Sequence, residues 1–186
     1  MQASSILWRR LDSPGHDGCR LDQTARGWQL AGTAVFVHDD QPAHLAYEIT
    51  CASDWHAVEG RVRGWIGTRA LEFRIRRTPD GAWSFNGAFA SGFVECSDID
   101  FGFTPATNLS QLRRVDLAVG QAADLPVAWL DVTSGHLEVL RQRYERRSQW
   151  TYWYEAPRFS YAALLEVTPE GFVRRYPGLW EAEQLR

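Results

Sequence analysis

Short runs of alternating hydrophobic and polar residues dominate the chain. Residues 28–37 form one such run, and the next run places Leu45, Tyr47 and Ile49 on one side. Because successive side chains of a strand point to opposite faces, this alternation is typical of half-buried β-strands. The polar segment at residues 38–42 between the two runs predicts a turn. We therefore expect the two runs to pair as neighbouring strands.

Two later pairs of runs are each joined by a turn of the same chemistry. The run at residues 71–76 leads into TPDG at residues 78–81, and the run at residues 161–168 leads into TPEG at residues 168–171. Proline presets the second position of a β-turn, and glycine accepts the positive φ that some turns need. Both segments therefore predict hairpins. Their likeness is compatible with an internal duplication, for which a shared turn type is weak evidence.

Helical signals are few. Residues 137–154 suit either a helix in their first part or strands throughout, and we expect strands. Residues 106–112 predict a helical turn with Thr107 or Asn108 as its cap. Many short strands with few helices to cover them must close on themselves. We therefore predict a single all-β domain over residues 1–186, a barrel-like antiparallel sheet, roll or sandwich with at most one or two short helical turns.

Composition narrows the surroundings and the partners. A formal net charge of -3 is at odds with the basic surface that nucleic acids require. All 20 basic residues are arginine, which excludes lysine chemistry and suits carboxylates, phosphates or sugar hydroxyls, although codon bias explains the same usage. Three widely spaced cysteines, no secretory leader and no apolar run near ~20 residues predict a reduced, cytoplasmic protein without a transmembrane segment.

Two carboxylates lie in the most informative stretch of the chain. Asp98 and Asp100 alternate with apolar residues, so on a strand they share one face at a separation of ~7 Å. That spacing suits a metal ion or an acid–base pair, but no histidine or third acid lies nearby in sequence. The alternative is structural, with the two acids bonded to turn amides or paired with Arg113 and Arg114.

The residues that follow these acids are short and polar. Thr104, Thr107 and Asn108 can satisfy local backbone groups in a rigid turn. They can also, together with Arg113 and Arg114, donate hydrogen bonds to a polar headgroup at the mouth of a cavity. The sequence leaves both interpretations open.

Rings and guanidinium groups are interleaved in two other places. Arg63 and Trp65 share a strand face, and Tyr152 and Tyr154 continue an aromatic stripe that starts at Trp150. Such surfaces suit stacking on sugars or holding an anionic head above an apolar pocket. A packed core with arginines along its surface is the alternative interpretation.

The sequence lacks the familiar motifs of catalysis and cofactor binding. Ser91 and Ser134 stand outside a G-x-S-x-G elbow, and the five histidines show no metal-ligand spacing. No glycine-rich nucleotide-binding string is present. We therefore expect no metal and no cofactor.

One stretch carries a resemblance to a known family. DIDFGFTPATN…LRR at residues 98–114, with GAWSFNG upstream and LRQRY, YWY and GFVRRYPGLW downstream, resembles the bacterial family named "Putative glycolipid-binding" over nearly the whole chain. The resemblance implies a single-domain spiral β-roll. The chain departs from the family at residues 109–112, where LSQL replaces a segment like TLPI and removes its proline. The matching positions are Asp98, Asp100, Thr104, Pro105, Thr107, Asn108, Arg113, Arg114, Gln142, Tyr144, Tyr152, Tyr154 and Tyr176.

These observations lead to one main hypothesis and two alternatives. The main one is non-catalytic binding of a glycolipid or related amphiphile, with apolar tails in a ring-lined cavity and polar side chains at its mouth. The alternatives are a small-substrate hydrolase with Asp98 or Asp100 as general base, and a protein-interaction module using exposed sheet edges. A monomer or a homodimer is compatible with each. The candidate ligand-binding residues are Asp98, Asp100, Thr104, Thr107, Asn108, Arg113, Arg114, Arg63, Trp65, Tyr144, Tyr152 and Tyr154.

Overall fold

The computed structural model describes residues 4–184, and most of these residues lie in β-strands. Its elements are β1 (Ser4–Arg10), β2 (Gly15–Thr24), β3 (Gly27–His38), β4 (Gln41–Cys51), β5 (Ala57–Ile66), β6 (Arg69–Arg77), β7 (Trp83–Phe85), β8 (Ala88–Ala90), β9 (Ile99–Phe101), α1 (Asn108–Val115), β10 (Ala122–Asp131), β11 (His136–Ser148), β12 (Thr151–Ala156), the short 3₁₀ helix η1 (Pro157–Phe159), β13 (Tyr161–Val167), β14 (Val173–Tyr176) and β15 (Trp180–Ala182).

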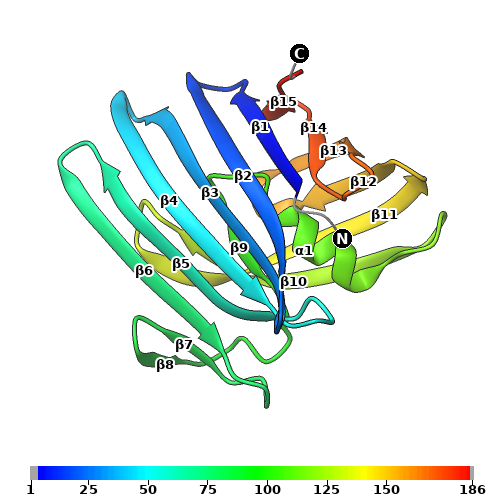
Figure 1. Ribbon diagram of the computed structural model, residues 1–186, viewed down its shortest axis with the longest axis horizontal. Helices are drawn as coiled ribbons and strands as arrows, with labels where there is room; N and C mark the ends of the chain where they lie inside the picture. The colour runs from blue at the N-terminus through cyan, green and yellow to red at the C-terminus, as the bar shows by residue number, and fades with distance from the viewer. Residues whose placement is uncertain (1–3, 185–186) are drawn as a thin grey trace.

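All the described strands belong to one sheet of 15 strands, which curls around α1 (Figure 1). The order across the sheet is β8-β7-β6-β5-β4-β3-β2-β1-β15-β14-β13-β12-β11-β10-β9. The first strand therefore lies in the middle of the sheet and pairs with the last, through Trp8 opposite Ala182 and Arg10 opposite Trp180. The two halves of the chain form the two arms of the curl.

The sheet winds as a spiral, because β9 lies inside the curl. A Cβ added at Gly60 on β5 would lie only 3.0 to 3.1 Å from the side chains of Ile99 and Phe101, so β9 packs directly on the inner face of β5. The rings of Phe101 and Tyr47 also meet, at 6.2 Å. The all-β roll predicted from sequence is confirmed. Two details differ, since the sheet does not close into a barrel and β9 pairs with β10 in parallel rather than antiparallel.

The predicted strands and turns appear where the alternating pattern placed them. Leu45, Tyr47 and Ile49 all point into the core, and the turn before their strand consists of Asp39 and Asp40, both with positive φ. Two residues of positive φ form the turn that suits the twist of a tight hairpin. Residues 137–154 are strands, as expected, on either side of a turn at residues 149–150.

The two TPxG hairpins are confirmed and share their hydrogen bonds. Gly81 donates its amide to the Thr78 carbonyl, and Gly171 donates to the Thr168 carbonyl, both at 2.9 Å. The first turn joins β6 to β7, and the second joins β13 to β14. The internal duplication that the two hairpins suggest stays a prediction.

Helix α1 begins and ends later than the sequence predicted. It covers eight residues, and its first five are buried between the arms of the sheet. Thr107 holds the N-cap position, but its side chain makes no capping hydrogen bond. That hydroxyl instead donates to Asp100 at 3.4 Å. The helix is therefore fixed by its surroundings rather than by a capping hydrogen bond, although Thr107 takes the cap position that the sequence predicted.

Candidate functional site

A cavity of about 400 Å³ lies inside the second arm of the sheet, beside the start of α1. Its lining combines a few polar side chains with many rings. The lining residues are Asp100, Phe101, Gly102, Thr104, Asn108, Trp129, Leu140, Gln142, Tyr154, Ala156, Phe159, Tyr161, Tyr176, Leu179 and Trp180.

Strand register explains why these residues share one space. In the parallel pair of β9 and β10, Asp100 lies opposite Trp129, so both side chains point to the same face. Gly102 leaves room for this ring, because a Cβ there would lie 2.7 Å from the Trp129 indole nitrogen. On β12, Ala156 lies opposite Tyr161 of β13 and faces the same cavity. The seven neighbouring strands from β9 to β15 thus gather the lining on the concave side.

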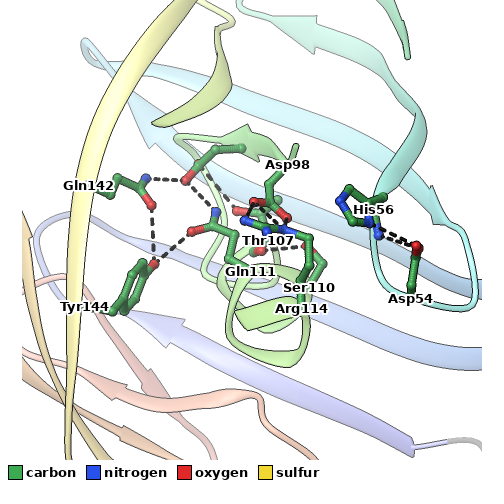
Figure 2. A network of polar contacts seen from close by, with 10 residues as sticks. Asp54, His56, Asp98, Thr107, Ser110, Gln111, Arg114, Gln142 and Tyr144 are labelled. Carbon is green, nitrogen blue, oxygen red and sulfur yellow. Dashed lines mark hydrogen bonds and ion pairs between the residues drawn. The ribbon is translucent and has the colours of Figure 1, made fainter. Parts of the chain in front are cut away.

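The polar end of the cavity is a directed network of hydrogen bonds that ends at Asp100. The side-chain amides of Gln142 and Gln111 both donate to its Oδ2, at 2.6 and 3.1 Å. The Tyr144 hydroxyl lies within hydrogen-bonding distance of both glutamine oxygens, at 3.0 and 3.3 Å, and accepts from the Asn108 amide at 2.6 Å. Figure 2 shows Gln142, Gln111 and Tyr144 converging from β11 and α1. The hydrogen bonds thus lead from Asn108 to Tyr144, from Tyr144 to the two glutamines, and from the glutamines to the Asp100 carboxyl group.

Burial opposes the charge that these donors favour. Asp100 is almost fully buried, and the loss of water raises its pKa above the ordinary value for aspartate. The hydrogen bonds from Gln142, Gln111 and Thr107 act in the opposite direction but do not cancel the effect. Neighbouring Asp98 adds a further, smaller rise in pKa. The described partners of Asp100 are therefore neutral hydrogen-bond donors, and none of them is a cation that would offset the cost of burying its charge.

Three tyrosines, Tyr154, Tyr161 and Tyr176, form one wall of the site, and Tyr144 packs behind them. Tyr154 packs against Tyr144 at 4.9 Å and against Tyr176 at 5.6 Å, and Tyr161 lies 5.5 Å from Tyr176. Burial raises the pKa of all four hydroxyls, that of Tyr161 to about 12. Each ring therefore stays neutral at physiological pH. The wall offers ring faces and hydroxyl groups together, which suits an amphiphilic or sugar-like ligand.

The structure brings four of the candidate residues to the cavity: Asp100, Thr104, Asn108 and Tyr154. Tyr144 supports the cavity from behind, through its bonds to Asn108 and the glutamines. Tyr152 is buried on the same strand face and has the Arg146 guanidinium over its ring at 5.6 Å. Ligand binding by any of these residues stays a prediction.

The expected place of Arg113 and Arg114 at the cavity mouth is corrected by the structure. Arg114 forms a bidentate ion pair with buried Asp98, with N–O distances of 2.7 to 3.0 Å (Figure 2). Arg113 donates to the carbonyl oxygen of Glu170 in the β13–β14 turn. Neither arginine lines the cavity. Of the two acids, Asp98 thus follows the structural interpretation, and Asp100 alone reaches the cavity.

Arg63 and Trp65 lie elsewhere, on the outer face of β5. Arg63 borders a wide, open depression of about 910 Å³ on the outer side of β1–β6, and Trp65 is 42% exposed beside His44. Many charged groups around this depression are already paired, such as Arg61 with Glu59. Although larger, the depression lacks the buried, converging polar groups of the inner cavity. We therefore take the inner cavity as the candidate site.

A second buried acid was missed from sequence. Asp17 on β2 has no solvent exposure, and its carboxyl group accepts hydrogen bonds from the Tyr47 hydroxyl at 3.0 and 3.1 Å and from Thr104. The signal was its place in an alternating run, because Asp17 takes an inward position followed by Cys19 and Leu21. Rings such as Trp129 and Trp180 were also missed, since nothing local marks which rings border a void.

Within residues 4–184, no three His, Cys, Asp or Glu side chains gather as a metal site would require. The three cysteines are buried free thiols. No helix in this part of the chain is long and apolar enough to span a membrane.

The fold and cavity define the class of protein, an all-β spiral roll with a ligand-sized space inside. The chain belongs to the family described as "Putative glycolipid-binding", whose model matches residues 5–182. It is similar to a DUF1089 family protein from Pseudomonas aeruginosa, known from a crystal structure at 1.80 Å resolution, with 28% identity, 94% coverage of each chain and a TM-score of 0.82. No curated protein matches the chain. The family resemblance stated from sequence is thus confirmed.

Proposed function

We propose that the inner cavity binds the sugar headgroup of a glycolipid without transforming it. The observation that carries the proposal is the convergence of Asp100, Asn108 and Gln142 at one end of a cavity walled by rings. Sugars present hydroxyls that suit carboxylate and amide groups and apolar faces that stack on rings. The family description points to the same kind of ligand.

Cavity size and exposure suggest how such a ligand would lie. A volume of about 400 Å³ is at the lower end of the range for ligand pockets, roughly 300–1,000 Å³. It suits a sugar head better than a pair of acyl chains. Phe159 lines the cavity and is 51% exposed, so we place the exit of the tail beside this ring. This arrangement puts polar groups deep and apolar groups outside, the reverse of what the sequence suggested.

Binding is favoured over hydrolysis by the number of carboxyl groups. Most glycoside hydrolases use two carboxyl groups, one as acid and the other as nucleophile or base. Asp100 supplies the one carboxyl group in the lining, because Asp98 is engaged by Arg114. A single acid held by two amide donors is suited to recognition.

The proposal is tested by filling the cavity. Octyl glucoside, below its micelle-forming concentration, is titrated into the protein by calorimetry. Ala156→Trp places an indole in the cavity and should weaken binding by at least about tenfold, since the ligand loses its space. Ala162→Trp is the matched control, because Ala162 is exposed on the neighbouring strand. Equal binding by the two variants, or no binding by the unmodified protein, would contradict the proposal.

A further inference from the structure

The cavity holds one ionisable acid and no cation to balance it. Asp100 is the one carboxylic acid in the lining, and the lining has no arginine or histidine. Three arginines that lie close to residues of the lining or to Asp98 are engaged elsewhere. Arg114 pairs with Asp98, Arg158 pairs with Glu138, and Arg10 pairs with Asp12.

The network around Asp100 is arranged for a carboxylate. Gln142 and Gln111 donate to the same oxygen, and Tyr144 engages both glutamine oxygens, which fixes the amide groups with their N–H side toward the acid. Each of these described partners donates to Asp100, so the hydrogen bonds favour the charged carboxylate, whereas burial raises its pKa. What the site lacks is a positive charge.

The aromatic rings that line the cavity can bind a positively charged group of a ligand. The faces of tryptophan and tyrosine rings attract cations. Two rings of the lining already contact cations that do not themselves line the cavity. The Arg158 guanidinium lies 5.0 Å from the Trp129 ring, and the Arg10 guanidinium lies 5.5 Å from the Trp180 ring. Tyr154 and Tyr176 complete the wall and stay neutral.

We infer that the headgroup bound in this cavity carries a positively charged nitrogen, as the ammonium group of an amino sugar does. The nitrogen lies against Asp100, within the ring wall. This inference rests on the proposed function and narrows it to one ligand class. Phosphate, sulfate and carboxylate headgroups are disfavoured, because they would bring a second negative charge to a buried acid.

The test compares three octyl glycosides that differ at one position. Calorimetry at pH 7 measures octyl glucosaminide, octyl glucoside and the neutral octyl N-acetylglucosaminide. The amine should bind at least about tenfold tighter than either neutral glycoside, since a desolvated cation–π contact and an ion pair add to the sugar contacts. Free glucosamine that binds as tightly as its octyl glycoside supports the inference and contradicts a role for the tail.

Asp100→Asn removes the charge and keeps the shape. It should abolish the preference for the amine while octyl glucoside still binds. Asp124→Asn is the control, because Asp124 is an exposed acid on neighbouring β10 and should leave the preference unchanged. If Asp100→Asn does not fold, the affinities of the three glycosides for the unmodified protein still show whether the cavity prefers the amine.

The outcomes separate this inference from the proposed function. If octyl glucoside binds in the cavity and the amine binds no tighter, the inference fails and the proposed function stands. A preference for an anionic octyl glucuronide overturns the inference in the same way. If none of the glycosides binds, both fail.

Discussion

At the scale of single residues, the unusual feature is the buried acid Asp17, whose partners within residues 4–184 are hydroxyl groups and not a cation. Asp17 is fully buried, and its burial raises its pKa to about 6. The hydroxyls of Thr104 and Tyr47 lower the pKa but recover only part of this effect. The Tyr47 ring reaches across Gly32 of β3, where an added Cβ would lie 2.3 Å from the ring. This acid links β2, β4 and the loop before α1.

Asp17 should make stability depend on pH. Its folded pKa lies above its unfolded value, so its contribution to stability is complete below the unfolded pKa and is lost as pH rises through about 6. Asp17→Asn removes this loss. Relative to the unmodified protein, the variant should therefore gain about 1 kcal/mol between pH 5 and pH 7.5, whatever its absolute stability. Urea unfolding at both pH values measures the gain, and exposed Asp124→Asn is the control. If Asp17→Asn differs from the unmodified protein by the same free energy of unfolding at both pH values, the pH dependence does not come from Asp17.

At the scale of elements, two neighbouring acids hold α1 against β9. Asp98 binds Arg114 from the last turn of the helix, and Asp100 binds Gln111 from its middle. The sequence predicted that the two acids share a strand face and offered Arg113 and Arg114 as possible partners for them. It could not assign Gln111 and Gln142 to Asp100, because that depends on how α1 and β11 lie in space. Alternation predicted the strands, but the partners of β1 and β9 are set by contacts far apart in sequence.

Breaking one side of the Asp98–Arg114 pair should be costly. Arg114→Met leaves a buried carboxylate without its partner and should lower the free energy of unfolding by roughly 3–5 kcal/mol. Adding Asp98→Asn should recover part of this loss, because the stranded charge is gone. Arg113→Met is the control, since it loses bonds to a carbonyl oxygen and strands no charge. Equal losses for Arg114→Met and Arg113→Met in urea unfolding would show that the pair does not brace the helix.

At the scale of the whole molecule, both arms of the curl share one core. A single cluster of buried hydrophobic side chains includes Trp8 and Leu45 from the first arm and Tyr144 and Leu165 from the second. The Trp8 indole also donates to the Val173 carbonyl at 2.6 Å, across the junction of the arms. The sequence predicted one all-β roll from its many strands. The spiral winding came only from the family resemblance, because the packing of Ile99 and Phe101 at Gly60 joins residues far apart in sequence.

This shared core predicts that the two arms unfold together. Near-ultraviolet circular dichroism reports the packing of the rings, and far-ultraviolet circular dichroism reports the strands. Both signals should follow one transition in urea with the same midpoint, as expected for a single cooperative unit. Two separate transitions would mean that each arm folds by itself, and would contradict the prediction of a single domain.

The pairing of β1 with β15 also has a consequence for synthesis. During translation β1 emerges before the other strands of this sheet, yet one of its neighbours is made only when residues 180–182 leave the ribosome. Until then the nascent chain carries a strand with unpaired amides on one side, which is the kind of edge that recruits other chains. Correct assembly therefore waits until residues 180–182 have been made, and a ribosome that stalls before them leaves the sheet unpaired between β1 and β15.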